Sequence, residues 1–244
     1  MKASAIIPAR LGSTRLPRKV LADIHGKPLV WHVWNQVCRA HNFDSVYVAT
    51  DSTEVQEIIE SFGGQVLMTS PDCRSGTERI VECIDRVESD FIVNVQGDEP
   101  LIDPGMLDAL VARWLENPVD LITPVFRINT TEEINNPNVV KVVRRANREA
   151  IYFSRSPIPF VRDTPQEQWL EKHDFWGHIG VYGYHRKVLA DYPNMPVSPL
   201  EQAESLEQLR FLDAGYTFQT LETDYRSVAV DVLDDLERVR ELLK

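Results

Sequence analysis

The chain has 244 residues, and 37 acidic side chains against 26 Lys and Arg give a formal net charge of −11. That length suffices for one large or two small domains with a sizeable core, and 43% hydrophobic with 26% charged residues is typical of a globular protein, not a disordered or fibrous one. The acidic balance argues against a nucleic-acid platform and against adsorption on anionic membranes, because both need clustered Lys and Arg. A small anionic ligand at a local basic cluster stays possible.

The cysteines and the N-terminus predict a protein of a reducing compartment. Cys38, Cys73 and Cys83 form no C-x-x-C pair, so neither a disulfide framework nor a thiolate metal site is indicated. The apolar stretch at residues 3–9 is too short for a signal peptide before Arg10 ends it. No apolar run is long enough to cross a bilayer. We therefore expect a cytoplasmic protein.

The first half of the chain alternates short apolar runs with amphipathic stretches, a pattern typical of βαβ units around a largely parallel sheet. We expect strands at residues 3–8, 45–50, 64–68 and 91–95, and helices at residues 53–62 and 77–87. Asp98 then follows the carboxyl end of a strand. In open α/β sheets, ligands bind at that edge.

The second half is less regular. We expect strands at residues 139–143, 150–154 and 179–184, and helices at residues 200–214 and 234–244. The polar segment 164–174 is typical of an exposed loop or lid. No repeat and no Pro/Gly-rich linker marks a boundary, so the sequence predicts one α/β domain with a β-rich insertion.

A basic loop follows the first expected strand. Four cations fall within ten residues of an otherwise acidic chain: Arg10, Arg15, Arg18 and Lys19. Gly12 lets backbone approach a ligand closely, and Ser13 and Thr14 offer hydroxyl groups, so this loop could surround a polyphosphate. It is neither a P-loop nor a dinucleotide fingerprint. A solvated basic loop remains the alternative.

A series of short motifs runs in order along nearly the whole chain. They are ARLGSTRLPRKVL at 9–21, VATD at 48–51, SGTER at 75–79, VNVQGDEP at 93–100, NPNVVKVV at 136–143, YFSR at 152–155, HIGVYGY at 178–184, SPLE at 198–201, LEQLR at 206–210, VD at 230–231 and DLERVR at 235–240. Together they strongly resemble the sugar-acid cytidylyltransferases, especially the family of 3-deoxy-manno-octulosonate (Kdo) cytidylyltransferases.

The resemblance implies an enzyme that joins CTP and an eight-carbon sugar acid, with Mg²⁺, to give a CMP-sugar for lipopolysaccharide biosynthesis and pyrophosphate. It implies a nucleotide-diphospho-sugar transferase-like α/β fold, with a mostly parallel central sheet flanked by helices and a smaller β-rich insertion. About residues 1–125 would bind the nucleotide, about 126–225 would serve the sugar and dimerisation, and 226–244 would hold a return strand and a terminal helix. A homodimer is expected.

The resemblance also assigns the nucleotide and metal sites. It places CTP on Ala9, Arg10, Gly12, Ser13, Arg15, Lys19, Ser75, Arg79 and Gln96. Catalysis is then mostly positioning and charge neutralisation by Arg10, Arg15, Lys19 and Asp98. Asp98 and Asp231 are the expected Mg²⁺ ligands, since Mg²⁺ favours one or two carboxylates plus phosphate oxygens. Without the resemblance, Asp98 is a turn residue and Asp231 a helix N-cap, and SGTE is a capping turn.

The sugar site is expected in the second half. The resemblance assigns the sugar carboxylate to Arg155 and the sugar hydroxyls to His178, Tyr182, Glu207 and Gln208. Taken singly, the His and Tyr are typical of a half-buried strand, and the Glu and Gln of a solvated helix face. No catalytic base stands out, with His178 the one possible exception, and a bound metal could lower the pKa of the sugar hydroxyl instead.

Several positions depart from the family pattern. Arg18 stands where the family usually has glycine, the turn after Asp231 reads Val232-Leu233, and Gly177 replaces a common basic residue before the histidine motif. An amine-bearing sugar would need no cation at that place, so the acceptor is expected to be Kdo or its 8-amino-3,8-dideoxy analogue. The alternatives are another sugar acid, such as a sialic acid, and a non-catalytic nucleotide-sugar sensor.

Overall fold

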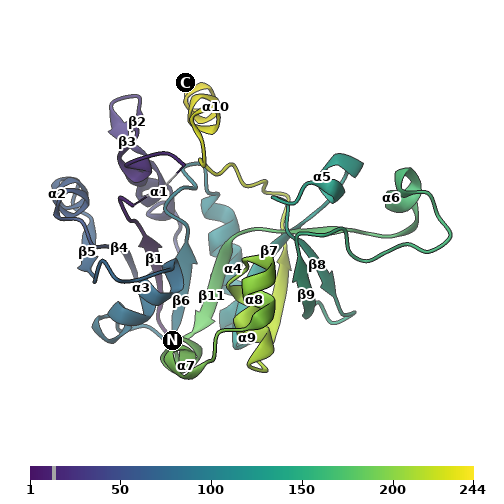
Figure 1. The fold of residues 1–244 in the computed structure, drawn as a ribbon. Helices are drawn as coiled ribbons and strands as arrows, with labels where there is room; N and C mark the ends of the chain where they lie inside the picture. Colours follow the sequence, from purple (N-terminus) through teal and green to yellow (C-terminus); the bar gives the residue numbers. More distant parts are fainter. Residues whose placement is uncertain (13–14) are drawn as a thin grey trace.

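One mixed sheet of ten strands runs through the computed structural model, which describes residues 1–12 and 15–244 (Figure 1). Four neighbouring strands are parallel: β5 (Gln65–Met68), β4 (Ser45–Thr50), β1 (Ala3–Pro8) and β6 (Phe91–Val95). These are the four strands expected in the first half, and the βαβ prediction is confirmed there. Ser13 of the expected CTP site lies outside the described residues.

The rest of the sheet is largely antiparallel. The order continues from β6 through β11 (Val181–His185), β7 (Leu121–Arg127), β10 (Trp176–His178), β8 (Lys141–Arg144) and β9 (Ala150–Ser154), and β12 (Phe218–Glu222) pairs in parallel with β7. The expected β-rich insertion therefore extends the same sheet. Residue 125, where the nucleotide half was expected to end, lies inside β7, so one sheet joins the two halves.

Helices cover both faces of this sheet because alternate residues of each strand point to opposite sides. Ala5 and Ile7 belong to one apolar core and Ile6 to the other. The first core includes side chains of α1 (Leu29–Val37), α2 (Thr53–Ser61), α4 (Pro104–Glu116) and α10 (Leu233–Leu242). The second includes α3 (Gly76–Cys83), α7 (Arg186–Asp191) and α9 (Gln208–Asp213). Of these helices, α1, α4 and α7 lie outside the predicted elements.

Two expected elements differ from the structure. The helix expected at 200–214 is broken into α8 (Pro199–Glu204) and α9, because Ser205 adopts a left-handed conformation with φ 51°. The return strand expected after residue 226 is absent from the described residues, since the strand that returns to the sheet is β12 and residues 223–232 hold neither helix nor strand. Individual backbone and side-chain hydrogen bonds hold that segment instead of a strand ladder.

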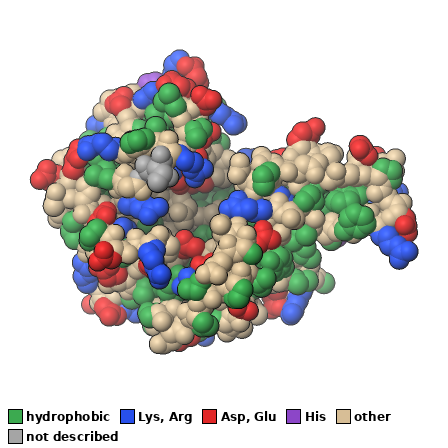
Figure 2. All heavy atoms as spheres, viewed as in Figure 1, with side chains coloured by type: hydrophobic (Ala, Val, Ile, Leu, Met, Phe, Trp, Pro, Cys, Tyr) green, Lys and Arg blue, Asp and Glu red, His purple; other side chains and the backbone are tan. Residues whose placement is uncertain are grey.

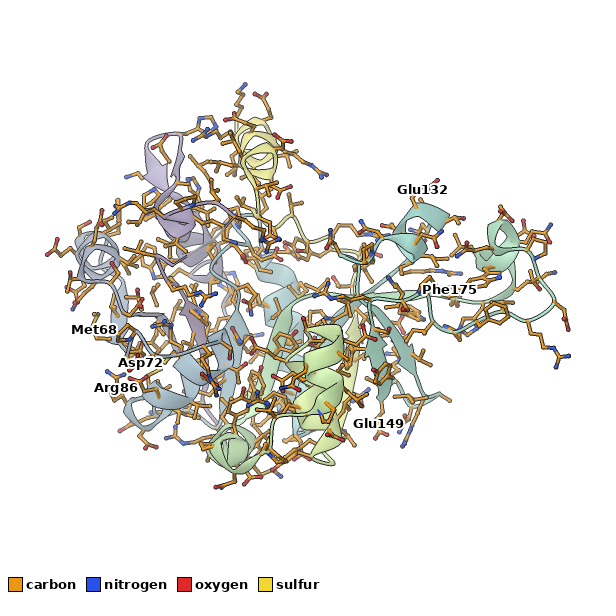
Figure 3. All side chains as sticks on the ribbon, viewed as in Figure 1. Met68, Asp72, Arg86, Glu132, Glu149 and Phe175 are labelled. Atoms are coloured by element: carbon orange, nitrogen blue, oxygen red, sulfur yellow. The ribbon has the colours of Figure 1, made fainter. Side chains whose placement is uncertain are left out.

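A projecting part of the chain carries α5 (Thr131–Asn135) and α6 (Trp169–Lys172), and Figure 3 places Glu132 and Phe175 on it. The segment 164–174, expected as a loop, holds the 3-10 turn Gln166–Gln168 and α6, because Trp169 is buried and stacks on Phe175 with ring centroids 5.8 Å apart. The remaining elements are short: β2 (Asp23–Ile24), β3 (Lys27–Pro28) and 3-10 turns at Lys19–Leu21, Ile84–Arg86 and Tyr192–Asn194. Among the described residues, no helix is both long and apolar enough to cross a bilayer.

Candidate active site

A cleft of about 300 Å³ opens at the carboxyl ends of β1 and β6, the sheet edge where open α/β folds bind ligands. Its lining residues come from far apart in the sequence: Pro8, Ala9, Arg10, Gly12, Arg15, Lys19, Val20, Arg74, Ser75, Gly76, Arg79, Gln96, Gly97, Asp98, Glu207 and Asp231. Gly97 lets the turn after β6 pack on the end of β1, since a Cβ there would lie 2.5 Å from the Pro8 carbonyl oxygen. Lys and Arg side chains surround the hollow in Figure 2.

Lys19 joins the two expected metal ligands at the centre of this cleft. Its Nζ donates to Asp98 Oδ2 at 2.6 Å and to Asp231 Oδ1 at 3.2 Å. Arg15 Nη2 donates to the same Asp231 oxygen at 2.8 Å. The Lys19 side chain is only 12% exposed, so its charge is less screened by water than that of a surface lysine. Folding thus brings together residues that are 79 to 216 positions apart.

The Asp98 and Asp231 carboxylates form a place for a cation, and the residues fit a magnesium ion. Both carboxylates already converge on one positive charge, and Mg²⁺ is usually bound through one or two carboxylates together with phosphate and water oxygens. No group of three or more His, Cys, Asp or Glu side chains that could hold a metal occurs in the described ranges 1–12 and 15–244. Asp98 and Asp231 are the residues that would hold the ion, and its other ligands would be substrate and water oxygens.

The rim of the basic loop is left open for a ligand. Arg10 lines the cleft and pairs with no acidic side chain of the described residues. A Cβ added at Gly12 would meet no atom of the described residues within 4 Å, so packing against that part of the chain does not require glycine at this position. These features, with Arg15 and Lys19, suit an anionic ligand that approaches the backbone closely.

The SGTER turn forms a second wall. Ser75 is the N-cap of α3, where its Oγ accepts from the Glu78 backbone N–H, so the capping interpretation holds as well. Arg79 is almost fully buried and donates to Thr69 Oγ1, with Asp51 3.7 Å away. One Asp51 oxygen, Oδ1, is buried without a hydrogen-bond partner in the described chain. This wall offers fixed polar groups of the kind that recognise a base edge.

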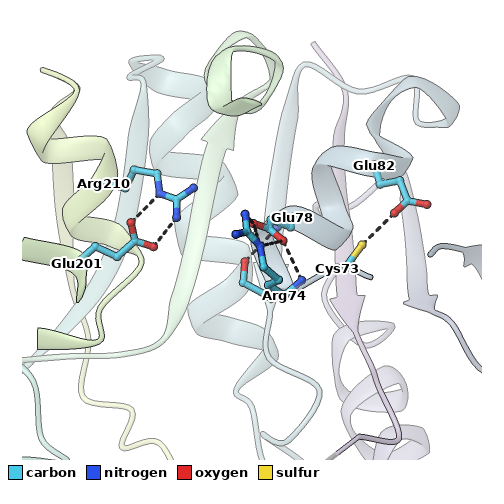
Figure 4. Close-up of polar contacts among 7 residues, drawn as sticks. Cys73, Arg74, Glu78, Glu82, Glu201 and Arg210 are labelled. Carbon is cyan, nitrogen blue, oxygen red and sulfur yellow. Dashed lines mark hydrogen bonds and ion pairs between the residues drawn. The ribbon is translucent and has the colours of Figure 1, made fainter. Parts of the chain in front are cut away.

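Three side-chain pairs lie near this wall and across from it (Figure 4). Arg74, which lines the cleft, donates to Glu78, and Arg210 forms a two-pronged pair with Glu201 at 2.6 and 2.8 Å. Cys73 donates to Glu82, and burial raises the pKa of its thiol to about 11, so it is no nucleophile. Arg74 was not predicted as a site residue, although it directly precedes the SGTER motif.

Three of the expected sugar residues form a connected group beside the cleft, in which His178 and Tyr182 are half-buried and Gln208 is buried. The rings of His178 and Tyr182 lie 5.3 Å apart, and Tyr182 donates its hydroxyl to Gln208 Oε1 at 3.2 Å. The amide Nε2 of Gln208 is buried and has no partner among the described residues. Glu207, next in sequence, lines the cleft. An unpaired buried amide is costly, so it suits a ligand hydroxyl that would accept its hydrogen bond.

Thr123, which the sequence did not single out, fixes the tautomer of His178. Its Oγ1 has one proton and donates it to the Val181 carbonyl at 2.7 Å. The same oxygen lies 2.9 Å from His178 Nε2 and therefore accepts from it. Burial lowers the pKa of His178 to about 3, so the ring is neutral and Nδ1 carries a lone pair. His178 can accept a hydrogen bond but is a weak base.

Arg155, the expected partner of the sugar carboxylate, is held by three backbone carbonyls. Its guanidinium donates to the backbone carbonyls of Glu204, Pro137 and Ser205 at 2.7 to 3.3 Å. These bonds hold the connection between α8 and α9. Each Nη atom keeps a second N–H, and the predicted contact with a sugar carboxylate depends on those two donors.

Glu99 is a buried carboxyl directly behind the cleft. It follows Asp98 in the chain, is 4% exposed and accepts from the hydroxyls of Ser227 and Tyr225. Burial raises its pKa to about 7, against the lowering effect of these hydrogen bonds. The sequence placed it in the QGDEP motif but gave no sign of its partners, which lie 126 and 128 positions away.

Comparison with known proteins identifies the family. The cytidylyltransferase family model matches residues 4–221. The 3-deoxy-manno-octulosonate cytidylyltransferases of Geobacter sulfurreducens and Chlorobium limicola are 46% and 43% identical to the chain, and the alignments cover all of this chain and 100% and 98% of theirs. The chain belongs to the 3-deoxy-manno-octulosonate cytidylyltransferase family.

Solved structures agree with this assignment. A CMP:2-keto-3-deoxy-manno-octonic acid synthetase, solved with CTP, is 42% identical, superposes with a TM-score of 0.93 and aligns over 100% of this chain and 98% of its own. A putative glucose-1-phosphate thymidylyltransferase from Bacillus anthracis, 16% identical, superposes with a TM-score of 0.68 over 98% of this chain and 94% of its own. The second likeness shows the fold alone, and it confirms the nucleotide-diphospho-sugar transferase architecture for this cytidylyltransferase.

Packing against a neighbouring strand explains why glycine occupies position 177 of this cytidylyltransferase. It pairs with Phe126 between β10 and β7, and a Cβ at residue 177 would lie 2.3 Å from the Phe126 ring. A longer side chain at 177 would meet that ring. The missing basic residue is thus explained without reference to the sugar, and the argument from Gly177 for an 8-amino sugar loses its support.

Proposed function

We propose that this protein transfers the cytidylyl group of CTP to Kdo, which gives CMP-Kdo for lipopolysaccharide biosynthesis and releases pyrophosphate. The observation that carries the proposal is the convergence of Lys19 with Asp98 and Asp231 in the cleft, next to Arg10 and Arg15. This arrangement suits phosphoryl transfer, because cations can neutralise a triphosphate while two carboxylates hold a metal ion. It also argues against a sensor, which would need no such centre.

The nucleotide would bind with its phosphates on the basic loop and its base at the SGTER wall. Arg10, Arg15 and Lys19 face the part of the cleft nearest the two aspartates. Ser75, Arg79 and Gln96 line the remainder. Arg79 is held by Thr69 and Asp51 and cannot reorient freely, so it presents a fixed charge that favours one orientation of the base.

The sugar would lie between Gln96 and the group of His178, Tyr182 and Gln208. A Cβ built at Gly180 would lie 3.8 Å from Gln96 Cγ, so Gln96 lies beside the backbone between His178 and Tyr182. His178 Nδ1 would accept from one sugar hydroxyl, and Gln208 Nε2 would donate to another. Both groups are fixed by hydrogen bonds to Thr123 and Tyr182, which reduces the entropy lost when the sugar binds.

The reaction then needs positioning more than a protein base. The anomeric hydroxyl oxygen of Kdo attacks the α-phosphorus and gives up its proton to solvent, the bond to the α,β-bridging oxygen breaks, and pyrophosphate leaves. Arg10, Arg15 and Lys19 stabilise the charge that moves onto the leaving group. Magnesium held by Asp98 and Asp231 would supply charge neutralisation and lower the pKa of the attacking hydroxyl. His178, with its lowered pKa and bound Nε2, orients the sugar.

The assay is pyrophosphate release from CTP, Mg²⁺ and Kdo, with CMP-Kdo identified by mass spectrometry. Asp98→Ala should lose turnover by about two orders of magnitude or more while staying folded. Glu116→Ala is the control, because Glu116 is an exposed acid at the end of α4. No release by the wild type with Kdo, or near-normal release by Asp98→Ala, would contradict the proposal. The 8-amino analogue, tested in parallel, should give a lower kcat/KM.

We also propose that the protein is a homodimer. Phe160 is 74% exposed on the projecting part of the chain, where it lies edge-on to Trp169. Large exposed aromatic side chains are typical of protein interfaces. Sedimentation velocity should show a dimer for the wild type and a monomer for Phe160→Glu. A wild-type monomer at all concentrations would overturn this proposal and leave the activity assignment intact.

A further inference from the structure

The segment that carries Asp231 has no regular structure of its own. Residues 223–232 form neither helix nor strand, so their position depends on individual hydrogen bonds. Two of these are made by the backbone around the metal ligand: Val230 N–H donates to the Asp98 carbonyl at 2.9 Å, and Asp231 N–H to Asp235 Oδ2 at 2.9 Å. The first bond connects the two expected metal ligands through the main chain.

Glu99 adds side-chain bonds to the same connection. Its Oε1 accepts from Ser227 Oγ, and its Oε2 from the Tyr225 hydroxyl at 3.3 Å. Glu99 is not among the described residues that line the cleft, so it lies behind the space proposed for the substrates. A carboxyl that is 4% exposed must be compensated by hydrogen bonds, and both hydroxyls come from the segment that leads to Asp231.

We propose that Glu99 is a positioning residue: it ties the 225–231 segment to the QGDEP turn, so that Asp231 reaches the cation held by Asp98. The inference rests on the proposed metal role of these two aspartates. Asp98 is placed by the sheet, because it lies in the turn just after β6, which ends at Val95. Asp231 lies outside the sheet. Lys19 and Arg15 bond its carboxylate and Asp235 bonds its N–H, while the bond from Val230 and the contacts of Glu99 hold the segment before it against the turn of Asp98. Loss of the Glu99 contacts should therefore weaken metal binding more than nucleotide binding.

The variants are Ser227→Ala, Tyr225→Phe and Glu99→Gln. The first two each remove one hydroxyl and leave Glu99 in place, so they test the proposal even if the third fails to fold. Ser89→Ala is the matched control, because it also removes a buried hydroxyl contact, the 2.6 Å bond with Ser4. Residues 4 and 89 lie at the opposite end of the parallel strands from the cleft.

Metal binding is read directly by titration of Mn²⁺ with the CTP-loaded protein, with free Mn²⁺ counted by electron paramagnetic resonance. We expect Ser227→Ala to weaken Mn²⁺ binding, and to raise the Mg²⁺ concentration for half-maximal rate, by about 10-fold. Affinity for CTP without metal should stay within about 2-fold, and excess Mg²⁺ should restore kcat. Ser89→Ala should lower Tm without a change in Mn²⁺ affinity.

Two results would overturn the inference. One is unchanged Mn²⁺ affinity in Ser227→Ala and Tyr225→Phe despite a lowered Tm, which is the behaviour of a purely structural hydrogen bond. The other is an equal loss of Mn²⁺ affinity in Ser89→Ala. Failure of the proposed function appears elsewhere: a wild type that binds Mn²⁺ and CTP but releases no pyrophosphate with Kdo would refute the activity and leave the role of Glu99 standing.

Discussion

Replacement of Lys19 by methionine tests the charge arrangement of the cleft. The variant keeps the length and apolar stem of the side chain and removes the charge that Asp98 and Asp231 share. A pair of unit charges about 4 Å apart interacts by about 4 kcal/mol at an effective dielectric constant of 20. Desolvation of the ammonium offsets much of this attraction, and so does screening by water, because the two carboxylates are 27% and 39% exposed. We expect a net destabilisation of about 2 kcal/mol without Mg²⁺.

Thermal unfolding measures this loss. For a chain of this size about 2 kcal/mol corresponds to a Tm lower by about 4–8 °C. Mg²⁺ should raise the Tm of Lys19→Met more than that of the wild type, because a divalent ion can replace the ammonium between the carboxylates. The control is Lys187→Met, which breaks the exposed pair with Asp120 at 2.8 Å and should cost less than about 1 kcal/mol. Equal Tm values for the two variants, or no added effect of Mg²⁺, would refute the reasoning.

Three further predictions concern residues around the sheet. Thr123→Val removes the acceptor of His178 Nε2, so the KM for Kdo should rise about 10-fold while the KM for CTP stays unchanged in steady-state assays. Lys141 is fully buried, and desolvation lowers its pKa to about 8. Between about pH 8 and 10 the unfolded chain binds a proton that the folded chain lacks, so the free energy of unfolding in urea should rise with pH by up to about 3 kcal/mol. This pH dependence should vanish in Lys141→Met. Gly177→Ala should lose about 1–3 kcal/mol by calorimetry, with part recovered by adding Phe126→Leu; a neutral Gly177→Ala would remove the packing explanation.

The parallel half of the fold was predictable because its signals are local. Short apolar runs followed by amphipathic stretches marked β1, β4 and β6 at their observed bounds, and the loops that follow β1 and β6 hold the cleft residues. The basic loop and Asp98 could be placed at one sheet edge because parallel strands end on the same side. The motifs then supplied Asp231, which no local pattern connects with Asp98.

The second half was less predictable because long-range contacts decide its local structure. Nothing in the sequence around Ser205 indicates its left-handed φ. In the structure, Arg155 donates hydrogen bonds to the carbonyls of Glu204 and Ser205 at this turn. Gly177 looked like a change in the sugar pocket, yet the ring of Phe126 on another strand explains it. The partner of a buried side chain cannot be read from its own neighbours in sequence.

The net charge of −11 gives no indication of how positive and negative side chains are paired in the cleft. There, Lys19 compensates two carboxylates in the folded chain, while Arg10 has no acidic partner among the described residues. Lys19 cannot keep both aspartates and also bind a triphosphate at full strength, because its three N–H donors would have to be divided between them. On the proposed metal role, uptake of a metal ion by Asp98 and Asp231 would release Lys19 toward the phosphates. Metal binding and phosphate binding would then be coupled through one side chain, and each should strengthen the other by the same factor.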